Sequence, residues 1–411
     1  MAEITQFRAP EDVKRWSTIS LFVGAIGTLV TLVFVPLVVP DLREQALRSW
    51  LLGFVFWGGI GIGCIGVLML QYLTGGAWGV VSRRVLEAGT RTLPVLFILF
   101  LPMMIGVATA SVYNWTHLSP VTDEAMRHRG WYMTPWGWIG RSVIYFLLLG
   151  VTAWYLNRWS REQDAATTAE GAAKYLILAS RFSGPSMVIF SLIVTFAAVD
   201  WVMMLDPHFF STIFGMLFIA GWALSCFCFV VLILALLSDK APMDRVVGKR
   251  HFHDLGKLML ALVMVWAYFN FSQFLIIWSG NIPEETVWFL VRMKGVWGVV
   301  GVLLIFFHFA FPFLVLLHQD FKRKARWLAT LAIFILVMRV LDMLYLIGPT
   351  PRISDPAAVH GTFIIHWLDI VGPIGVGGIW LWAFFNQLMK RPLAPMNDPY
   401  FEPAIEHGKG H

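Results

Sequence analysis

The chain has 411 residues, of which 58% are hydrophobic and only 14% charged, and its net charge is +6. Together with a mean hydropathy of +0.70, this composition excludes a water-soluble globular enzyme and makes lipid the main solvent of the protein. The positive charge does not call for a nucleic-acid partner, because Lys and Arg are concentrated in alternate loops, as membrane topology favours.

Ten apolar runs are long enough to cross a bilayer, which needs about 20 residues in a helix. We expect little of the chain to lie outside them, and we expect one membrane domain over residues 1–411 with no attached soluble domain. The fold class is therefore all-α, a polytopic membrane protein. In chain order, the predicted spans cover residues 17–39, 51–73, 93–113, 138–156, 175–200, 211–237, 255–279, 290–317, 327–348 and 363–388.

The orientation of these spans follows from the basic residues of the loops. Most Lys and Arg lie in loops on the side of the N-terminus. The opposite loops carry only Arg43, Arg48, Arg127, Arg129 and Arg352. Because positive charge near helix ends is retained in the cytoplasm, both termini are predicted to be cytoplasmic, which an even number of spans permits.

The parity of the spans permits an internal repeat. Residues 51–200 and 211–348 each contain four predicted spans, and each block begins and ends on the outer side. We therefore expect two four-helix bundles, flanked by the helices 17–39 and 363–388.

Glycine distinguishes two of the predicted spans. The second span is glycine-rich over residues 53–66, which predicts close approach of neighbouring helices. The tenth span contains Gly372-Pro373-Ile374-Gly375-Val376-Gly377-Gly378, a combination expected to weaken or kink a helix in its middle.

Tryptophan and cysteine have simple interpretations. Many of the 20 Trp residues, such as Trp115, Trp138, Trp201, Trp278 and Trp327, lie near span ends, which is typical of interfacial aromatic belts. The three cysteines fall inside apolar spans without metal-site or disulfide spacing, and we interpret them as packing residues.

Ionisable groups at membrane depth are costly and are the first functional candidates. The ninth span carries Arg339 and Asp342, and the tenth carries His366 and Asp369, each pair three residues apart on one helical face. Helical rise places both carboxylates roughly 8 to 11 Å below the outer surface. We therefore expect one polar cluster, serving either as an ion pair that fixes two helices or as a proton-conducting or ligand-facing site.

Two further polar groups lie on other spans. Asp200 ends the fifth span, where it could cap a solvated loop, face a partner or form a proton exit. Tyr268, Asn270 and Gln273 form an uncharged polar stretch of the seventh span. This stretch predicts either interhelical hydrogen bonds or a hydrated path or quinone contact.

The histidines bear on protons and on haem. Asp254 and Lys257, at the inner end of the seventh span, could admit protons toward His308, or they could be simple interfacial residues. Only His308 and His366 lie well inside spans, and helical rise separates them in depth by on the order of 15 Å. A bis-histidine haem needs level imidazoles, so haem within this chain is not expected.

Six strings carry a resemblance to a known family: Leu51–Trp57, Gln71–Gly79, Arg83–Glu87, Asp200–Trp201, His253–Lys257 and Trp266–Glu285. Together they resemble the smaller, ActF-type, of the two ten-helix membrane subunits of bacterial alternative complex III. That subunit belongs to the polysulfide-reductase-like, NrfD-type membrane family. The resemblance extends over about residues 17–390, and the run 266–285 is its most specific part.

The resemblance implies a quinol-oxidising complex of the bacterial inner membrane that delivers electrons to a cytochrome c or similar carrier. The implied partners are a larger ten-helix subunit associated with the quinol site, an iron-sulfur protein and a multihaem cytochrome c. The quinol, iron-sulfur clusters and c-type haems would belong to these subunits. This chain would bind no cofactor and would serve as a scaffold and a candidate proton path, so no catalytic residue is assigned.

Two alternatives remain open at this point. One is a quinol-binding membrane anchor of an NrfD-type reductase, in which this chain holds the quinol headgroup. The other is a secondary transporter that works alone, suggested by the expected break in the tenth helix and by the permitted repeat.

Overall fold

A computed structural model describes residues 7–353 and 365–409, and every regular element in these two ranges is a helix. The helices of the N-terminal half are α2 (Glu11–Leu29), α3 (Val35–Val38), α4 (Arg43–Thr74), α5 (Ala77–Thr90), α6 (Leu93–Ala108), α7 (Glu124–Arg129), α8 (Pro135–Ala165) and α9 (Ala169–Trp201). Those that follow are α10 (Phe214–Leu237), α11 (Lys249–Gly280), α12 (Pro283–Met293), α13 (Gly295–Leu303), α14 (Phe311–Leu317), α15 (Gln319–Lys322), α16 (Ala325–Ile347), α17 (Leu368–Met389) and α18 (Phe401–Lys409).

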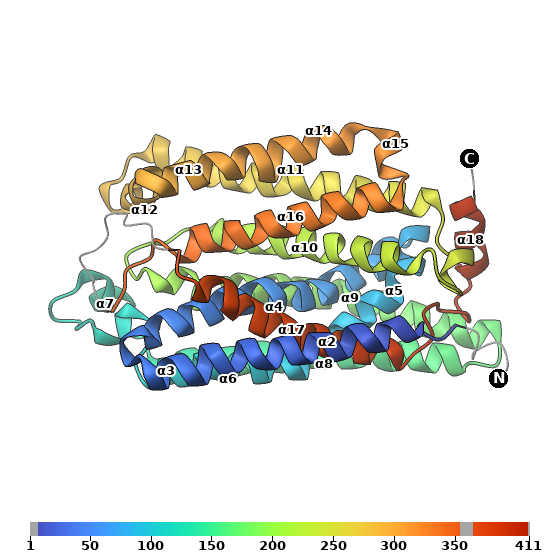
Figure 1. Cartoon of the computed structure of the whole chain (residues 1–411), viewed down its shortest axis with the longest axis horizontal. Helices are drawn as coiled ribbons and strands as arrows, with labels where there is room; N and C mark the ends of the chain where they lie inside the picture. The colour runs from blue at the N-terminus through green and yellow to red at the C-terminus, as the bar shows by residue number, and fades with distance from the viewer. Residues whose placement is uncertain (1–6, 354–364, 410–411) are drawn as a thin grey trace.

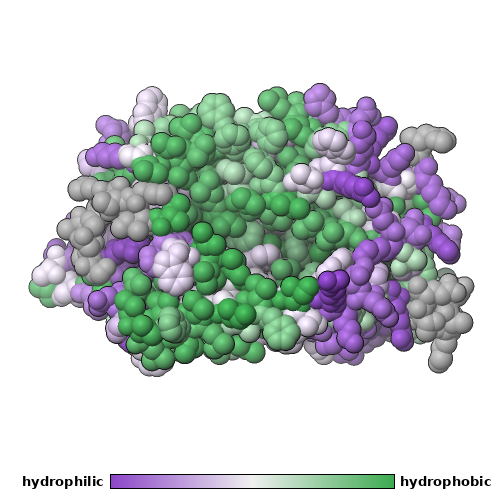
Figure 2. Space-filling model, viewed as in Figure 1, coloured by the Kyte–Doolittle hydropathy of each residue, from purple (hydrophilic) through white to green (hydrophobic). Residues whose placement is uncertain are grey.

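The long helices lie side by side along one axis (Figure 1), and a broad apolar band separates two hydrophilic ends (Figure 2). Within the described ranges, nine helices are long and apolar enough to cross a membrane, or ten if the bent pair α5 and α6 counts as one span. The all-helical architecture predicted from composition is therefore confirmed, and the apolar helices are consistent with a multi-pass membrane protein. The beginning of α2 and the short helix α18 lie at the same end of the molecule (Figure 1).

The third predicted span differs most from its expected form. It was expected over residues 93–113, but α6 ends at Ala108 and α5 precedes it at an angle of 42°. Leu93 and Pro94 begin α6, and proline at this position lacks an N–H that a helix N-terminus leaves free in any case. The chain turns at Arg91 and Thr92, and α5 packs against α4, α17 and α18.

The glycine-rich helix α4 is the centre of the fold, and nearly all of its residues are buried. A Cβ atom on Gly53 would lie 2.7 Å from the Cα of Pro373, and one on Gly63 would lie 2.7 Å from the carbonyl oxygen of Trp222. Real side chains do not tolerate such contacts, so both positions require glycine for the close approach of α17 and α10. The close packing predicted for the second span is confirmed.

The glycines of α17 do not break the helix, which continues from Leu368 to Met389. They face glycines of α2 instead: a Cβ atom on Gly27 would lie 2.7 Å from the Cα of Gly375. Interlocking of small residues lets the backbones touch, as in other membrane helix pairs. The motif therefore joins α2, α4 and α17, and the break on which the transporter hypothesis relied is absent.

One hydrophobic core extends through both predicted blocks, because α4 and α10 pack together along their length. Cys64 of α4 and Cys226 of α10 meet there, with their sulfur atoms 3.6 Å apart. A second, smaller cluster, which includes Trp266 and Met338, fills the space between α10, α11, α13 and α16. The two helices of the flanking pair, α2 and α17, pack on each other at the side of this core (Figure 1).

The prediction of interfacial belts is wrong for Trp115, Trp138 and Trp201, which are at most 1% exposed. All three rings belong to the hydrophobic core, where the ring of Tyr113 packs against Trp115 and Trp138 and its hydroxyl donates a hydrogen bond to the carbonyl oxygen of Trp201. Trp138 donates a hydrogen bond to the carbonyl oxygen of Asp200 at 2.7 Å, which satisfies its polar atom. Trp278 and Trp327, by contrast, are 67% and 58% exposed near helix ends, as expected for a belt.

Candidate functional site: buried charges between the helices

The ninth predicted span carries a buried ion pair. Arg339 donates to the carboxylate of Asp342, one turn further along α16, and the two side chains are 1% and 2% exposed. The indole nitrogen of Trp266 on α11 donates to the same carboxylate at 3.2 Å. Gly221 of α10 leaves the space for the Arg339 guanidinium, since a Cβ atom there would overlap it. The pair on α16 therefore faces both α10 and α11.

His308 belongs to the same group, although its role was predicted separately. It lies in a π-helical stretch, Leu304–Ala310, and is fully buried with its ring edge-to-face against Trp266 at a centroid distance of 4.1 Å. Neither ring nitrogen has a hydrogen-bond partner. Trp266 thus connects His308 to the Asp342 carboxylate. We call Arg339, Asp342, Trp266 and His308 the second-bundle cluster.

The tenth predicted span does not join this cluster, so the expected single cluster is wrong. Asp369 accepts hydrogen bonds from Gln45 at 2.8 Å and Ser49 at 2.5 Å, both on α4, and from the backbone N–H of His366 at 3.0 Å. No hydrogen bond or ion pair in the described ranges joins Asp369 or His366 to Arg339 or Asp342. The physical reason is that the Asp369 carboxylate faces α4, whereas the Asp342 carboxylate faces Trp266 of α11.

Asp200 is fully buried, so the expectation that it caps a solvated loop is wrong. Its carboxylate accepts two hydrogen bonds from Arg141, at 2.9 and 3.0 Å, and one from the Tyr145 hydroxyl at 2.7 Å. Arg141 stacks on the ring of Tyr132, and burial, with the nearby Asp200 charge, raises the pKa of Tyr132 to about 12. A bidentate pair of this kind holds α8 and α9 together.

The polar stretch of the seventh predicted span divides between two faces of α11. Tyr268 is 65% exposed and faces away from the bundle, so it takes no part in an internal path. Asn270 donates to the carbonyl oxygen of Trp266, one turn earlier in its own helix. Gln273 is buried, and neither atom of its amide has a hydrogen-bond partner.

The residues expected to admit protons lie at the beginning of α11. Asp254 accepts from Lys257 at 3.4 Å and contacts His407 of α18 at 2.8 Å. Twelve residues separate Asp254 from Trp266, which is about 18 Å along a helix. The structure therefore places Asp254 and Lys257 at the surface, far from His308.

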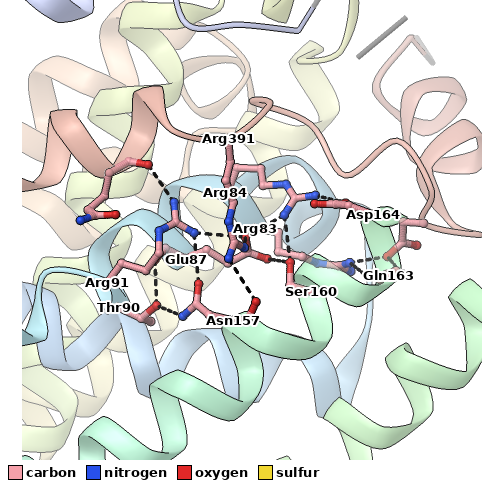
Figure 3. Close-up of polar contacts among 12 residues, drawn as sticks. Arg83, Arg84, Glu87, Thr90, Arg91, Asn157, Ser160, Gln163, Asp164 and Arg391 are labelled. Carbon is pink, nitrogen blue, oxygen red and sulfur yellow. Dashed lines mark hydrogen bonds and ion pairs between the residues drawn. The ribbon is translucent and has the colours of Figure 1, made fainter. Parts of the chain in front are cut away.

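An extensive buried polar network was not predicted as a site (Figure 3). Its centre is Glu87 of α5, which is fully buried and accepts from Arg84 at 2.8 Å, Ser160 at 2.6 Å and Arg391 at 3.1 Å. Arg91 lies 3.7 Å from the same carboxylate. We call this group the Glu87 network. Its hydrogen bonds and ion pairs join Arg91, at the bend between α5 and α6, to Ser160 of α8 and to Arg391 after α17 through the Glu87 carboxylate.

The neighbouring residue Arg83 forms a second part of the same polar region. It pairs with the fully buried carboxylate of Asp398, to which Gln163 also donates at 3.3 Å. The sequence predicts no site at Arg83, Arg84 or Arg91; the first two appear only in the string Arg83–Glu87 of the family resemblance. The spacing of Arg84, Glu87 and Arg91, three and four residues apart, would have revealed a charged helical face.

Comparison with protein-family models gave no match, and a search of curated proteins found no significantly similar sequence. Among the described residues there is also no group of three or more His, Cys, Asp or Glu side chains that could hold a metal ion. The cofactors and partner subunits implied by the sequence resemblance therefore stay predictions.

Proposed function

We propose that this chain is a membrane subunit, without a redox centre of its own, of a quinol:cytochrome c oxidoreductase of the alternative complex III type. It would reside in the bacterial cytoplasmic membrane with both termini in the cytoplasm. The sequence resemblance over residues 17–390 supports the family. The multi-pass helical fold and the placement of α18 and the beginning of α2 at one end agree with it.

The observation that carries a specific role is the position of the resembling run 266–285 in the fold. Its first residue, Trp266, contacts both His308 and Asp342, and its buried amide, Gln273, lies on the same helix. The most specific part of the resemblance thus contributes to the second-bundle cluster. We propose that this cluster is part of a proton path, in addition to the role of the chain as a scaffold.

The chemistry of the cluster suits proton transfer. Arg339 neutralises Asp342, so the pair adds no net charge to the interior. The imidazole of His308 can accept a proton at one nitrogen and release it from the other. Buried polar atoms without protein partners, such as those of His308 and Gln273, are typically matched by water, which would extend the path along α11.

Purification tests the assignment to a complex. The chain, tagged at its C-terminus and extracted from its native membrane in a mild detergent, should be recovered with an iron-sulfur protein and a multihaem cytochrome c. The preparation should also oxidise quinol. Recovery as a lone protein without redox-active partners would contradict the proposal.

The proton role needs a separate measurement on the intact complex. His308→Asn should lower the number of protons translocated per electron while leaving assembly unchanged. Glu162→Gln, which alters an exposed ion pair with Arg158, is the matched control and should behave like the wild type. An unchanged proton stoichiometry in the His308 variant would leave the cluster with a structural role only.

A further inference from the structure

A cavity of about 540 Å³ lies between α6 and α8, next to the Glu87 network. Along most of its length the wall is apolar, formed by residues such as Phe97 of α6 and Val143, Phe146 and Leu147 of α8. At one end the wall becomes polar, where Asn157 and three arginines converge. The lining is thus amphipathic, because most of the wall is apolar and one end is positively charged.

The charged end has an excess of positive charge. Arg91, Arg161 and Arg391 line it, and no carboxylate does. Arg91 donates to Asn157 at 3.1 Å and to the carbonyl oxygen of Gln387 at 2.9 Å, but its buried Nε has no partner. Arg161 makes no hydrogen bond or ion pair in the described ranges.

Glu87, the carboxylate that pairs with Arg91 and Arg391, cannot neutralise all three arginines. Glu87 already accepts from Arg84, Ser160 and Arg391, so its lone pairs are largely occupied (Figure 3). Burial lowers the pKa of Arg391, and Glu87 only partly offsets this effect. An anion bound at this end would therefore offset the excess positive charge of the three arginines. It would also accept hydrogen bonds from guanidinium N–H groups that have no acceptor in the protein, such as the Nε–H of Arg91.

We propose that this cavity binds an anionic phospholipid of the membrane, with its phosphate between Arg91, Arg161 and Arg391 and an acyl chain along Phe97 and Phe146. Guanidinium groups match the charge and geometry of a phosphate. Basic pockets between membrane helices are suited to anionic headgroups at the interface. A quinone headgroup is neutral and would leave the excess charge unmatched.

Two matched pairs of variants separate the effect of the positive charge on lipid binding from the effect of the cavity volume. Arg161→Gln removes a lining charge that the Glu87 network does not use. Arg158→Gln removes an exposed charge from the same helix, outside the cavity. Gly150→Leu fills the cavity, since a Cβ atom there meets only Leu93 at 3.8 Å. Gly140→Leu places the same side chain where nothing lies within 4 Å.

The experiment is native mass spectrometry of the delipidated full-length protein, with any subunits that accompany it, after addition of phosphatidylglycerol or phosphatidylcholine with identical acyl chains. The wild type should retain phosphatidylglycerol in preference to phosphatidylcholine. Arg161→Gln should weaken this retention about fivefold, the effect of one arginine near an anionic lipid. Gly150→Leu should abolish it, and both control variants should bind like the wild type.

Several results would overturn the proposal. Equal retention of the two lipids by the wild type would show that the charge plays no part. Retention of phosphatidylglycerol by all four variants at the wild-type level would place the lipid elsewhere. Recovery of a bound quinone that Gly150→Leu displaces and Arg161→Gln does not would assign the cavity to a neutral ligand. None of these outcomes depends on the proposed redox function.

Discussion

Replacement of Glu87 by Gln tests whether the Glu87 network stabilises the fold. The change keeps the shape of the side chain but removes the only carboxylate that pairs with Arg91 and Arg391 in the described ranges. Arg84 keeps a second partner, Asp164. Removing one member of a buried charge cluster costs roughly 3–5 kcal/mol, because the remaining charges are desolvated without compensation.

The control is Glu162→Gln on α8, the same substitution in an ion pair with Arg158, where the Glu162 side chain is 34% exposed and the Arg158 side chain 49% exposed. Solvent screening limits its expected cost to about 0–1 kcal/mol. The contrast between the two variants isolates burial, since charge and side-chain volume change in the same way in both.

The three cysteines, all buried, provide the assay. A thiol-reactive fluorophore reports unfolding as Cys64, Cys226 and Cys228 become accessible on heating in detergent. Scaling the usual temperature shift inversely with chain length gives roughly 1–2 °C per kcal/mol, so Glu87→Gln should lower the unfolding midpoint by about 3–10 °C. Equal midpoints for the Glu87 and Glu162 variants would refute the assigned role of burial.

Three further substitutions test other contacts, the first two by the same thermal assay and the third by limited proteolysis. Gly221→Ala should destabilise the protein by roughly 1–3 kcal/mol because the new methyl overlaps Arg339, whereas Gly140→Ala, in open space, should be neutral or slightly stabilising. Asp200→Asn should cost roughly 1–3 kcal/mol, since the Arg141 guanidinium loses its charged acceptor, and an unchanged midpoint would contradict the buried pair. Gly375→Val should force α17 away from Gly27 and expose α2 to limited proteolysis, and a wild-type digestion pattern would argue against the close helix contact.

Most of the fold could be predicted from the sequence because few backbone conformations can span a bilayer. Apolar runs of sufficient length must form helices that satisfy their own backbone hydrogen bonds, so composition and run length sufficed for a multi-pass helical protein. The glycines of α4 likewise predict close helix packing from the sequence alone. The second-bundle cluster was predicted only in part: Arg339, Asp342 and His308 were candidates because of their depth, but Trp266, which contacts both Asp342 and His308, was not.

What only the tertiary structure decided was the direction in which each buried polar side chain points. Asp342 and Asp369 are level by residue count, yet one faces α11 and the other faces α4, because depth along a helix says nothing about rotation around it. The Glu87 network depends on the packing of α5, whose buried residues Arg84 and Glu87 meet Ser160 of α8 and Arg391 after α17. Sequence alone therefore determined a helical protein with apolar spans long enough for a bilayer and with charged residues inside them, and only packing determined which of those charges meet.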